Sequence, residues 1–279
     1  MDLSLESSHK SQSPIGVFDS GVGGLTVARE IMRQLPEERM VYFGDTARVP
    51  YGNKSKETVT RYARQIIHFL QTKEVKAIVV ACNTASAFAL EQLRPEFDIP
   101  IIGVVKPGAK VAARITKNGI IGVIGTEGTI GSRIYTKMIQ KINEHAVVIG
   151  KACPLFVPLV EEGWLNDPIT QEIARRYLAS FHESGIDTLI LGCTHYPLLR
   201  SCLQTIMGEQ VSLVNPAYEA ALGLKKMLQE HKILSEGAEH TENPMYQFYV
   251  SDAEEKFKKF ANSILPCEIE EAQLIQIEE

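Results

Sequence analysis

Two stretches, Ala77-Ile78-Val79-Val80-Ala81-Cys82-Asn83-Thr84 and Thr188-Leu189-Ile190-Leu191-Gly192-Cys193-Thr194-His195, follow the same pattern. Each begins with an apolar, β-branched run that is typical of a buried strand, and each then presents a cysteine followed by polar residues. In open α/β sheets, ligands bind at the carboxyl ends of the strands. The pair therefore predicts a site with one thiol from each half of the chain.

Strands and helices alternate around the first of these stretches. The pattern predicts strands at residues 15–18, 40–43 and 100–104, and helices at 25–32, 56–73 and 86–93. A β-α-β-α-β order is typical of a parallel sheet with helices on both faces.

The same order begins again in the second half. Strands are predicted at 119–124 and 146–149, an apolar run at 156–160 leads to Glu161, and helices are predicted at 132–142 and 168–184. Ile15-Gly16-Val17 corresponds to Ile121-Gly122-Val123, as Cys82 does to Cys193. We therefore expect an α/β protein of two similar lobes. Each would be a mainly parallel sheet flanked by helices, with a pseudo-twofold relation and the active site between them.

The lobe boundaries follow from this repeat. Residues 1–13 are assigned to a disordered leader, and residues 108–217 to the second lobe. Residues 14–107 and 218–279 form the first lobe, to which a helix at 217–230, a strand at 247–250 and a helix at 254–264 are expected to return. The acidic residues 268–279 receive no secondary structure.

Composition excludes several classes of protein. The 279-residue chain has a net charge of −5 and a pI near 5.9, which argues against nucleic-acid binding as its main activity. It has neither an apolar run long enough to span a bilayer nor a signal-peptide core, so we expect a cytoplasmic protein with reduced thiols. Five cysteines without C-x-x-C spacing favour neither a disulfide framework nor a zinc site.

The turn Asp19-Ser20-Gly21-Val22-Gly23-Gly24 follows the first strand and invites comparison with dinucleotide-binding turns. Thr26 stands where the third glycine of that motif belongs, and the Asp19 carboxylate would repel a pyrophosphate. Two interpretations stay open. The turn either holds a carboxylate ligand on its backbone N–H groups or is a tight connection without a ligand.

Cys82 and Cys193 are the candidate reactive residues, whereas Cys153, Cys202 and Cys267 are interpreted as small buried hydrophobes. Helix N-termini just beyond the two strands would lower the thiol pKa and favour the reactive thiolate. A strand's period of two would place the side chains of Cys193 and His195 on one face, and Asp19 is the matching helper for Cys82.

Two thiols with nearby helpers suit a two-base proton transfer. One base removes a proton from one face of a carbon, and the conjugate acid of the other delivers a proton to the opposite face. Such a transfer demands no cofactor and no metal.

The motifs resemble those of glutamate racemases, the cofactor-independent enzymes that make D-glutamate for bacterial peptidoglycan. The resemblance extends from Pro14 to Leu199, and its matching segments are Pro14–Leu25, Tyr42–Gly52, Ala81–Ser86, Val123–Thr126, Cys153–Glu161 and Leu191–Leu199. It implies that Cys82 and Cys193 act on opposite faces of Cα, Cys82 on the D-enantiomer and Cys193 on the L-enantiomer. Asp19 and His195 would assist them and help to hold the amino and carboxylate groups.

The resemblance also implies the remaining substrate contacts. The implied substrate-binding residues are Ser20, Tyr51, Gly52, Asn83, Thr84, Thr126 and Thr194, with Glu161 near the amino group. It implies glutamate as the ligand and a homodimer as the assembly. Asn215-Pro216 departs from the Asp-Ser common in the family, which leaves the contacts of that loop open.

Three alternatives remain at this stage. The nearest is a racemase for aspartate or of broad specificity, because pocket depth is not readable from sequence. A second is a non-catalytic binder or an inhibitory partner of another enzyme, since some members of the family restrain DNA gyrase. A nicotinamide-dependent dehydrogenase is a distant third.

Overall fold

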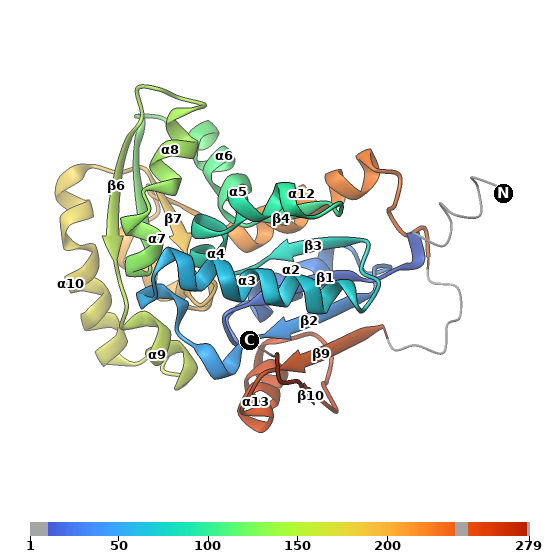
Figure 1. Cartoon of the computed structure of the whole chain (residues 1–279). Helices are drawn as coiled ribbons and strands as arrows, with labels where there is room; N and C mark the ends of the chain where they lie inside the picture. The colour runs from blue at the N-terminus through green and yellow to red at the C-terminus, as the bar shows by residue number, and fades with distance from the viewer. Residues whose placement is uncertain (1–10, 238–244, 278–279) are drawn as a thin grey trace.

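The computed structural model describes residues 11–237 and 245–277 (Figure 1). Two sheets form its framework, with strand orders β10-β9-β2-β1-β3-β4 and β6-β5-β7-β8, and every strand pair is parallel. Helices flank both sheets. The predicted α/β architecture with two parallel sheets is confirmed.

Helices cover both faces of the first sheet, and its strands β1, β2 and β3 are buried throughout. Its strands are β1 (Ile15–Asp19), β2 (Met40–Gly44), β3 (Ala77–Val80), β4 (Ile101–Gly103), β9 (Tyr246–Val250) and β10 (Gln273–Leu274). Val17 packs into the core on the side of α2 (Leu25–Gln34) and α12 (Pro216–Glu230). Its neighbour Phe18 packs on the other side, with α3 (Lys56–Gln71). Consecutive residues therefore serve opposite faces, as the pleat requires.

The second sheet is built in the same way. Its strands are β5 (Ile120–Gly125), β6 (Val147–Ala152), β7 (Thr188–Gly192) and β8 (Ser212–Val214). Leu189 packs with α10 (Pro168–Ser184) and α11 (Arg200–Met207), whereas Ile190 packs with α6 (Val105–Ile115) and α8 (Ile134–Gln140). The strands β3 and β7 are thus each held in place by hydrophobic cores on both faces of their sheet.

Most of the predicted elements are present, with some shifted bounds. The helices predicted at 168–184 and 254–264 are α10 and α13 (Glu254–Ile264). The helix predicted at 86–93 begins earlier, directly after Cys82, and divides into α4 (Asn83–Phe88) and α5 (Leu90–Leu93). The helix predicted at 132–142 is α8, and the short α7 (Glu127–Gly131) precedes it.

The sequence pattern misses several elements. It predicts no helix at α6, where Pro107 is tolerated because it lies in the first helical turn. It also misses α11, which follows the 3₁₀ turn η4 (Tyr196–Leu199). The apolar run at 156–160 lies in α9 (Phe156–Glu161), and β10 lies within the acidic tail. The remaining 3₁₀ turns are η1 (Thr46–Arg48), η2 (Tyr51–Asn53) and η3 (Arg94–Glu96).

Helices α6 and α12 carry the chain between the two sheets, and they pack on each other. Side chains of α6 belong to the core of the second sheet, and those of α12 to the core of the first. The lobe boundaries themselves stay a prediction. Residues 1–10 of the predicted leader lie outside the described residues, whereas the carbonyl of Ser11 accepts a 2.5 Å hydrogen bond from Lys76 Nζ.

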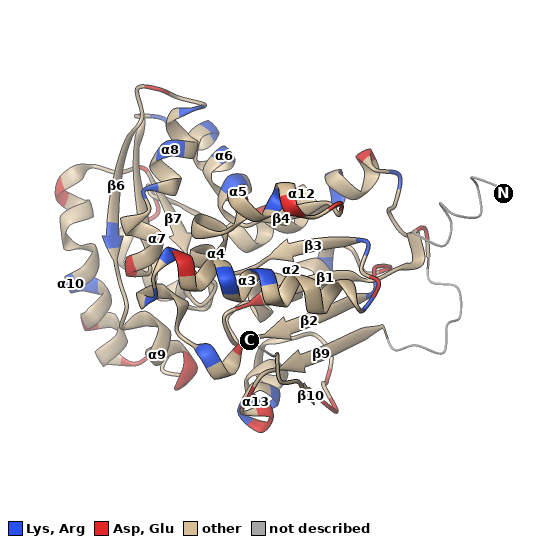
Figure 2. Cartoon of the chain, viewed as in Figure 1, with Lys and Arg blue, Asp and Glu red and all other residues tan. Residues whose placement is uncertain are grey.

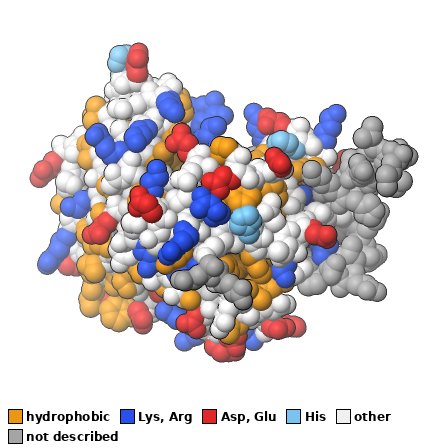
Figure 3. Space-filling model, in the orientation of Figure 1, with side chains coloured by type: hydrophobic (Ala, Val, Ile, Leu, Met, Phe, Trp, Pro, Cys, Tyr) orange, Lys and Arg blue, Asp and Glu red, His pale blue; other side chains and the backbone are white. Residues whose placement is uncertain are grey.

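Two further observations concern the helices and the charged surface of the molecule. Across residues 11–237 and 245–277, no helix combines the length and the apolar character needed to cross a membrane. Acidic and basic side chains are interspersed over the face shown in Figure 3.

Candidate active site

The two strand-end cysteines line one small cavity of about 50 Å³. Cys82 lies just beyond the carboxyl end of β3 in the first sheet, and Cys193 directly follows the carboxyl end of β7 in the second. The cavity also contains most of the predicted site residues, namely Ser20, Tyr51, Gly52, Asn83, Thr84, Thr126, Glu161, Thr194 and His195. The fold therefore gathers onto one cavity residues that lie more than half the chain apart in sequence.

Cys82 is the N-cap of α4, and its sulfur accepts a hydrogen bond from the Ala85 N–H at 3.4 Å. Its thiol donates to Ser20 Oγ at 3.8 Å. Burial, followed by the charge of Asp19, raises the pKa of Cys82 to about 12, against the weaker opposing effect of these hydrogen bonds. The Ala85 N–H at the helix N-terminus does lower this pKa, but desolvation outweighs it, so the prediction that the helix favours the thiolate at Cys82 is wrong. The structure favours a neutral thiol at Cys82.

Asp19 lies behind the cavity rather than on its wall. Its side chain is fully buried, and Oδ2 accepts the Gly21 N–H at 3.1 Å. Burial raises the pKa of Asp19, while the charge of His195 and the N–H groups of the turn oppose this. In this arrangement Asp19 acts on Cys82 through its charge, without a direct hydrogen bond to the sulfur.

Cys193 and His195 are brought together by a turn. Strand β7 ends at Gly192, and the following turn places His195 Nδ1 3.7 Å from Cys193 Sγ. The prediction that an extended strand aligns the two side chains is therefore wrong in its geometry, although the residues do meet. On its other side, His195 Nε2 lies 3.1 Å from Glu161 Oε1.

These neighbours determine the charge on His195. Burial alone would lower the pKa of its imidazole. The hydrogen bonds to Cys193 and Glu161, together with the negative charges of Cys193 and Asp19, instead raise that pKa to about 10. His195 is therefore a cation at neutral pH, and it lies directly beside the sulfur of Cys193, one of the two candidate catalytic residues.

Glu161, and not Glu162, is the acidic residue of the cavity. Its second oxygen, Oε2, lies 3.1 Å from Lys256 Nζ on α13. The pKa of Glu161 is lowered, first by the hydrogen bond with His195, against the effect of burial, and also by Lys256. The sequence gives no signal for Lys256, because it lies 95 residues away in a helix that shows only an ordinary amphipathic pattern.

The loop that carries Tyr51 is held by a buried carboxylate. Tyr51 donates its hydroxyl to Asp45, and Arg48 Nε lies 2.9 and 2.7 Å from the two oxygens of the same residue. The Arg48 guanidinium also stacks 4.1 Å from the centre of the Tyr62 ring. Sequence reasoning includes Asp45 and Arg48 only as parts of a longer motif and gives them no role.

Residues 15–222 match the Asp/Glu/hydantoin racemase family. The chain belongs to this family.

Relatives and solved structures from this racemase family are similar to this chain over nearly its whole length. Glutamate racemase from Geobacter metallireducens is 48% identical over 264 residues, which cover 95% of this chain and 97% of that protein. The Bacillus anthracis glutamate racemase isoform RacE1 has a TM-score of 0.89 at 40% identity, covering 96% of this chain and 98% of the other. The Francisella tularensis glutamate racemase, solved in complex with D-glutamate, has a TM-score of 0.88 at 39% identity, with coverage of 96% and 99%. The family resemblance expected from the motifs is confirmed.

The glycine turn of this racemase lets the two halves approach closely. A Cβ atom at Gly23 would lie within 2.5 Å of the His195 ring, so only glycine fits there. Thr26 Oγ1 donates to the carbonyl of Thr194 at 2.8 Å. Thr26, the residue that breaks the dinucleotide pattern, thus ties the first half to the loop that carries Cys193.

Two further side-chain contacts of cavity residues join the two halves of the racemase. Tyr135, on α8, donates its hydroxyl to Asn83 Oδ1 at 2.6 Å. Thr84 Oγ1 lies 2.8 Å from Thr126 Oγ1 and 3.2 Å from Thr129 Oγ1. Asn83 and Thr84 therefore reach the second half of the chain directly, and Tyr135 is a site residue that the sequence does not reveal.

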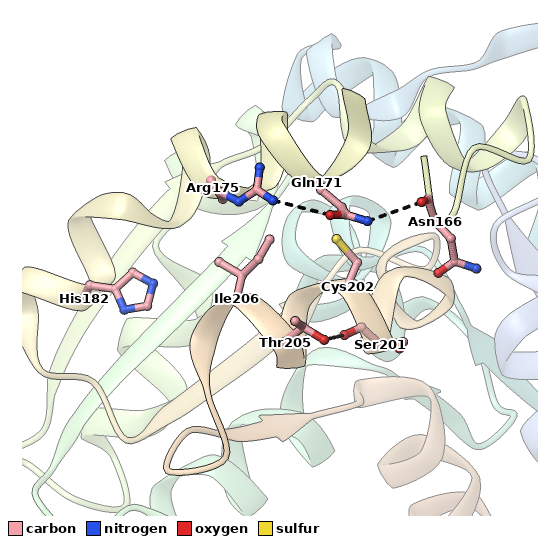
Figure 4. A pocket seen from close by; sticks show the side chains of 8 residues that line it. All are labelled: Asn166, Gln171, Arg175, His182, Ser201, Cys202, Thr205 and Ile206. Carbon is pink, nitrogen blue, oxygen red and sulfur yellow. Dashed lines mark hydrogen bonds between the residues drawn. The ribbon is translucent and has the colours of Figure 1, made fainter. Parts of the chain in front are cut away.

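A larger groove of about 490 Å³ lies elsewhere on the racemase, between α10 and α11 (Figure 4). It shares no lining residue with the thiol cavity. Arg175 reaches Gln171 at 3.4 Å along one wall, and Cys202 lies at its base. The pKa of Cys202 is raised by burial, in keeping with its interpretation as a small buried hydrophobe.

Proposed function

We propose that this protein interconverts L-glutamate and D-glutamate by proton transfer at Cα between two cysteines, and so supplies D-glutamate for peptidoglycan synthesis. The observation that carries the proposal is that two cysteine sulfurs line one cavity, and each follows the carboxyl end of a strand in a different sheet. Family membership and the glutamate racemase activity of the relatives support the choice of glutamate as substrate.

In the direction from L to D, Cys193 removes the Cα proton and the thiol of Cys82 delivers one to the opposite face. His195 lies beside the Cys193 sulfur and is the charged group suited to assist this transfer. Cys82, with its raised pKa, already carries the proton that it must donate. In the reverse direction the same groups exchange roles.

The cavity also has to make the Cα–H of glutamate, a very weak carbon acid, easier to deprotonate. A buried site in which the reacting groups are held close together removes much of the entropic cost of the transfer. Hydroxyl and amide groups on the wall, such as Ser20, Asn83 and Thr194, are suited to stabilise the substrate carboxylate as it gains enolate character. Glu161 is the acidic group on the wall and is suited to the ammonium. Asp19, which does not line the cavity, assists through its charge on Cys82.

A circular-dichroism assay of purified protein with L-glutamate and no added cofactor tests this function. We expect loss of optical activity until both enantiomers are equal. L-Aspartate, assayed in parallel, separates the rival specificity, since faster turnover of aspartate would overturn the glutamate assignment. Absence of turnover with both substrates would favour the non-catalytic alternative.

A homodimer and a cytoplasmic location also belong to this proposal, and both rest on the family resemblance. Sedimentation analysis of the pure protein tests the first. A sedimentation coefficient of a monomer at all concentrations would contradict it.

A further inference from the structure

Lys256 forms the outer end of a chain of charged groups that leads to Cys193. Its ammonium lies 3.1 Å from Glu161 Oε2, and Glu161 Oε1 lies 3.1 Å from His195 Nε2. His195 Nδ1 in turn lies 3.7 Å from Cys193 Sγ. The Glu161 carboxylate is thus shared, with one oxygen facing the cavity and the other facing α13.

The two ends of this chain belong to different sheets. Helix α13 is anchored to the first sheet by Phe257, which is fully buried and packs its ring 5.7 Å from that of Tyr42. Glu161 ends α9, which follows β6 of the second sheet. Figure 2 shows the acidic end of α9 and the basic residues of α13 near the lower edge of the molecule. The ion pair therefore crosses the boundary between the sheets.

Glu161 needs such a partner because its side chain is not fully enclosed. It is 24% exposed and forms part of the wall of an outer cleft of about 380 Å³, which Lys256 and Lys259 also line. A glutamate in this position has several rotamers available, and each ordered rotatable bond costs conformational entropy. A second contact on Oε2 removes the rotamers in which Oε1 turns away from His195.

We propose that Lys256 is a positioning residue of the racemase, which holds the outer oxygen of Glu161 and thereby keeps the inner oxygen on His195. This rests on the proposed function only in that His195 serves catalysis through Cys193. Lys256 itself touches neither the cavity nor the reacting sulfur.

Several charged groups act on this chain, and the test must separate them. His195 faces Cys193, Glu161 and Asp19, while Glu161 faces His195 and Lys256. Removing the Lys256 charge without any change in geometry would strengthen the attraction between Glu161 and the His195 proton and so raise the pKa of His195. Losing the position of Glu161 would weaken their hydrogen bond and lower that pKa. The direction of the change therefore distinguishes positioning from charge alone.

The experiment compares Lys256→Met with Lys256→Arg and Lys259→Met. Lys259 lies on the same helix and lines the same outer cleft, but it forms no ion pair within the described ranges, so Lys259→Met controls for charge and for steering of an anionic substrate. Histidine ¹⁵N NMR follows the titration of His195, with its resonance assigned by its absence from a His195→Gln spectrum. Racemisation is measured across the same pH range.

For Lys256→Met we expect a His195 pKa lower by about 0.5 than in the wild-type protein, and kcat/KM reduced about threefold, as for an exposed ion pair. Lys256→Arg should keep the His195 pKa and kcat/KM at their wild-type values, and Lys259→Met should change neither quantity. An unchanged or raised His195 pKa in Lys256→Met, or an equal loss in Lys259→Met, would overturn the proposal. The NMR titration does not depend on turnover, so an inactive wild-type protein would contradict the proposed function and leave this test intact.

Discussion

Cys82 and Cys193 occupy equivalent places, each just beyond a buried strand of a parallel sheet, yet their surroundings differ in sign. Cys82 has a buried carboxylate behind it, and the hydrogen-bond partners of its thiol, Ser20 and the Ala85 N–H, are neutral. Cys193 has the His195 cation beside it, supported by Glu161. The repeated strand and thiol determine where each sulfur lies, and residues outside the repeat determine its electrostatic surroundings.

This difference suits a racemase in its resting state. A two-base transfer needs one group that carries a proton and one that does not. Burial and the charge of Asp19 favour the thiol at Cys82, whereas Cys193 has an acid–base partner, His195, 3.7 Å from its sulfur. Each turnover reverses the protonation states, and the raised pKa of Cys82 favours its return to the thiol.

The largest expected effect comes from removing either sulfur. Cys82→Ala and Cys193→Ala should each lower racemisation by about 10³-fold or more, because a lone base cannot deliver a proton to the opposite face. The comparison becomes sharper in deuterated water. Cys82→Ala keeps Cys193, so it should still exchange the Cα proton of L-glutamate without inversion, and Cys193→Ala should do so with D-glutamate.

Cys267→Ser is the matched control for these variants, because Cys267 lies outside the cavity and is partly exposed. It should racemise at the wild-type rate. Near-normal turnover in either cavity variant would show that the two-base mechanism is wrong.

His195→Gln should have the next largest effect. It removes the cation from the Cys193 side, and we expect kcat/KM to fall about 10²-fold, within the range for loss of an acid–base group. The enantiomers have equal free energies, so the loss must be the same in both directions even though only one cysteine is affected. In the wild-type protein, activity should decline as pH rises through about 10, where His195 loses its proton. A His195→Gln profile that kept this alkaline decline would show that another group causes it.

The Asp19 side should respond more weakly and with the opposite sign. Asp19→Asn removes the negative charge that helps to raise the pKa of Cys82, so this pKa should fall. It should stay above the ordinary thiol value, because burial is the larger cause and is unchanged. We expect Cys82 to be alkylated about tenfold faster at a given alkaline pH, which corresponds to one pKa unit. Iodoacetamide labelling, read at the Cys82 peptide by mass spectrometry, measures this, and an unchanged rate would contradict the role of Asp19.

The sequence predicts the equivalent features of the two halves better than their differences. Strand, turn and thiol are local patterns, so apolar runs and residue spacing suffice to find Cys82 and Cys193 and to assign the α/β fold. The environment of each sulfur depends on contacts between distant segments. Nothing near Lys256 in sequence indicates that it meets Glu161, and nothing near Tyr135 indicates that it meets Asn83.

The wrong predictions have the same origin. The expected low thiol pKa considers a helix N-terminus, which is local, but omits burial and the charge of Asp19, which depend on the folded core. The expected strand alignment of Cys193 and His195 considers spacing alone, whereas β7 ends at Gly192, before either residue. Spacing shows which residues are available, and the turn decides how they meet.

The smallest expected effect tests the tie between Tyr135 and Asn83. Because the Tyr135 hydroxyl donates to Asn83 Oδ1, the amide nitrogen of Asn83 is left as the donor available to the cavity. Tyr135→Phe removes this constraint at a cost of about 1 kcal/mol, so KM for glutamate should rise about fivefold with kcat nearly unchanged. Tyr218→Phe, at an exposed position on α12, should leave both constants at wild-type values. A fivefold fall in kcat instead would mean that Asn83 stabilises the transition state. The residues around Cys82 would then contribute to catalysis beyond the proton that the Cys82 thiol donates.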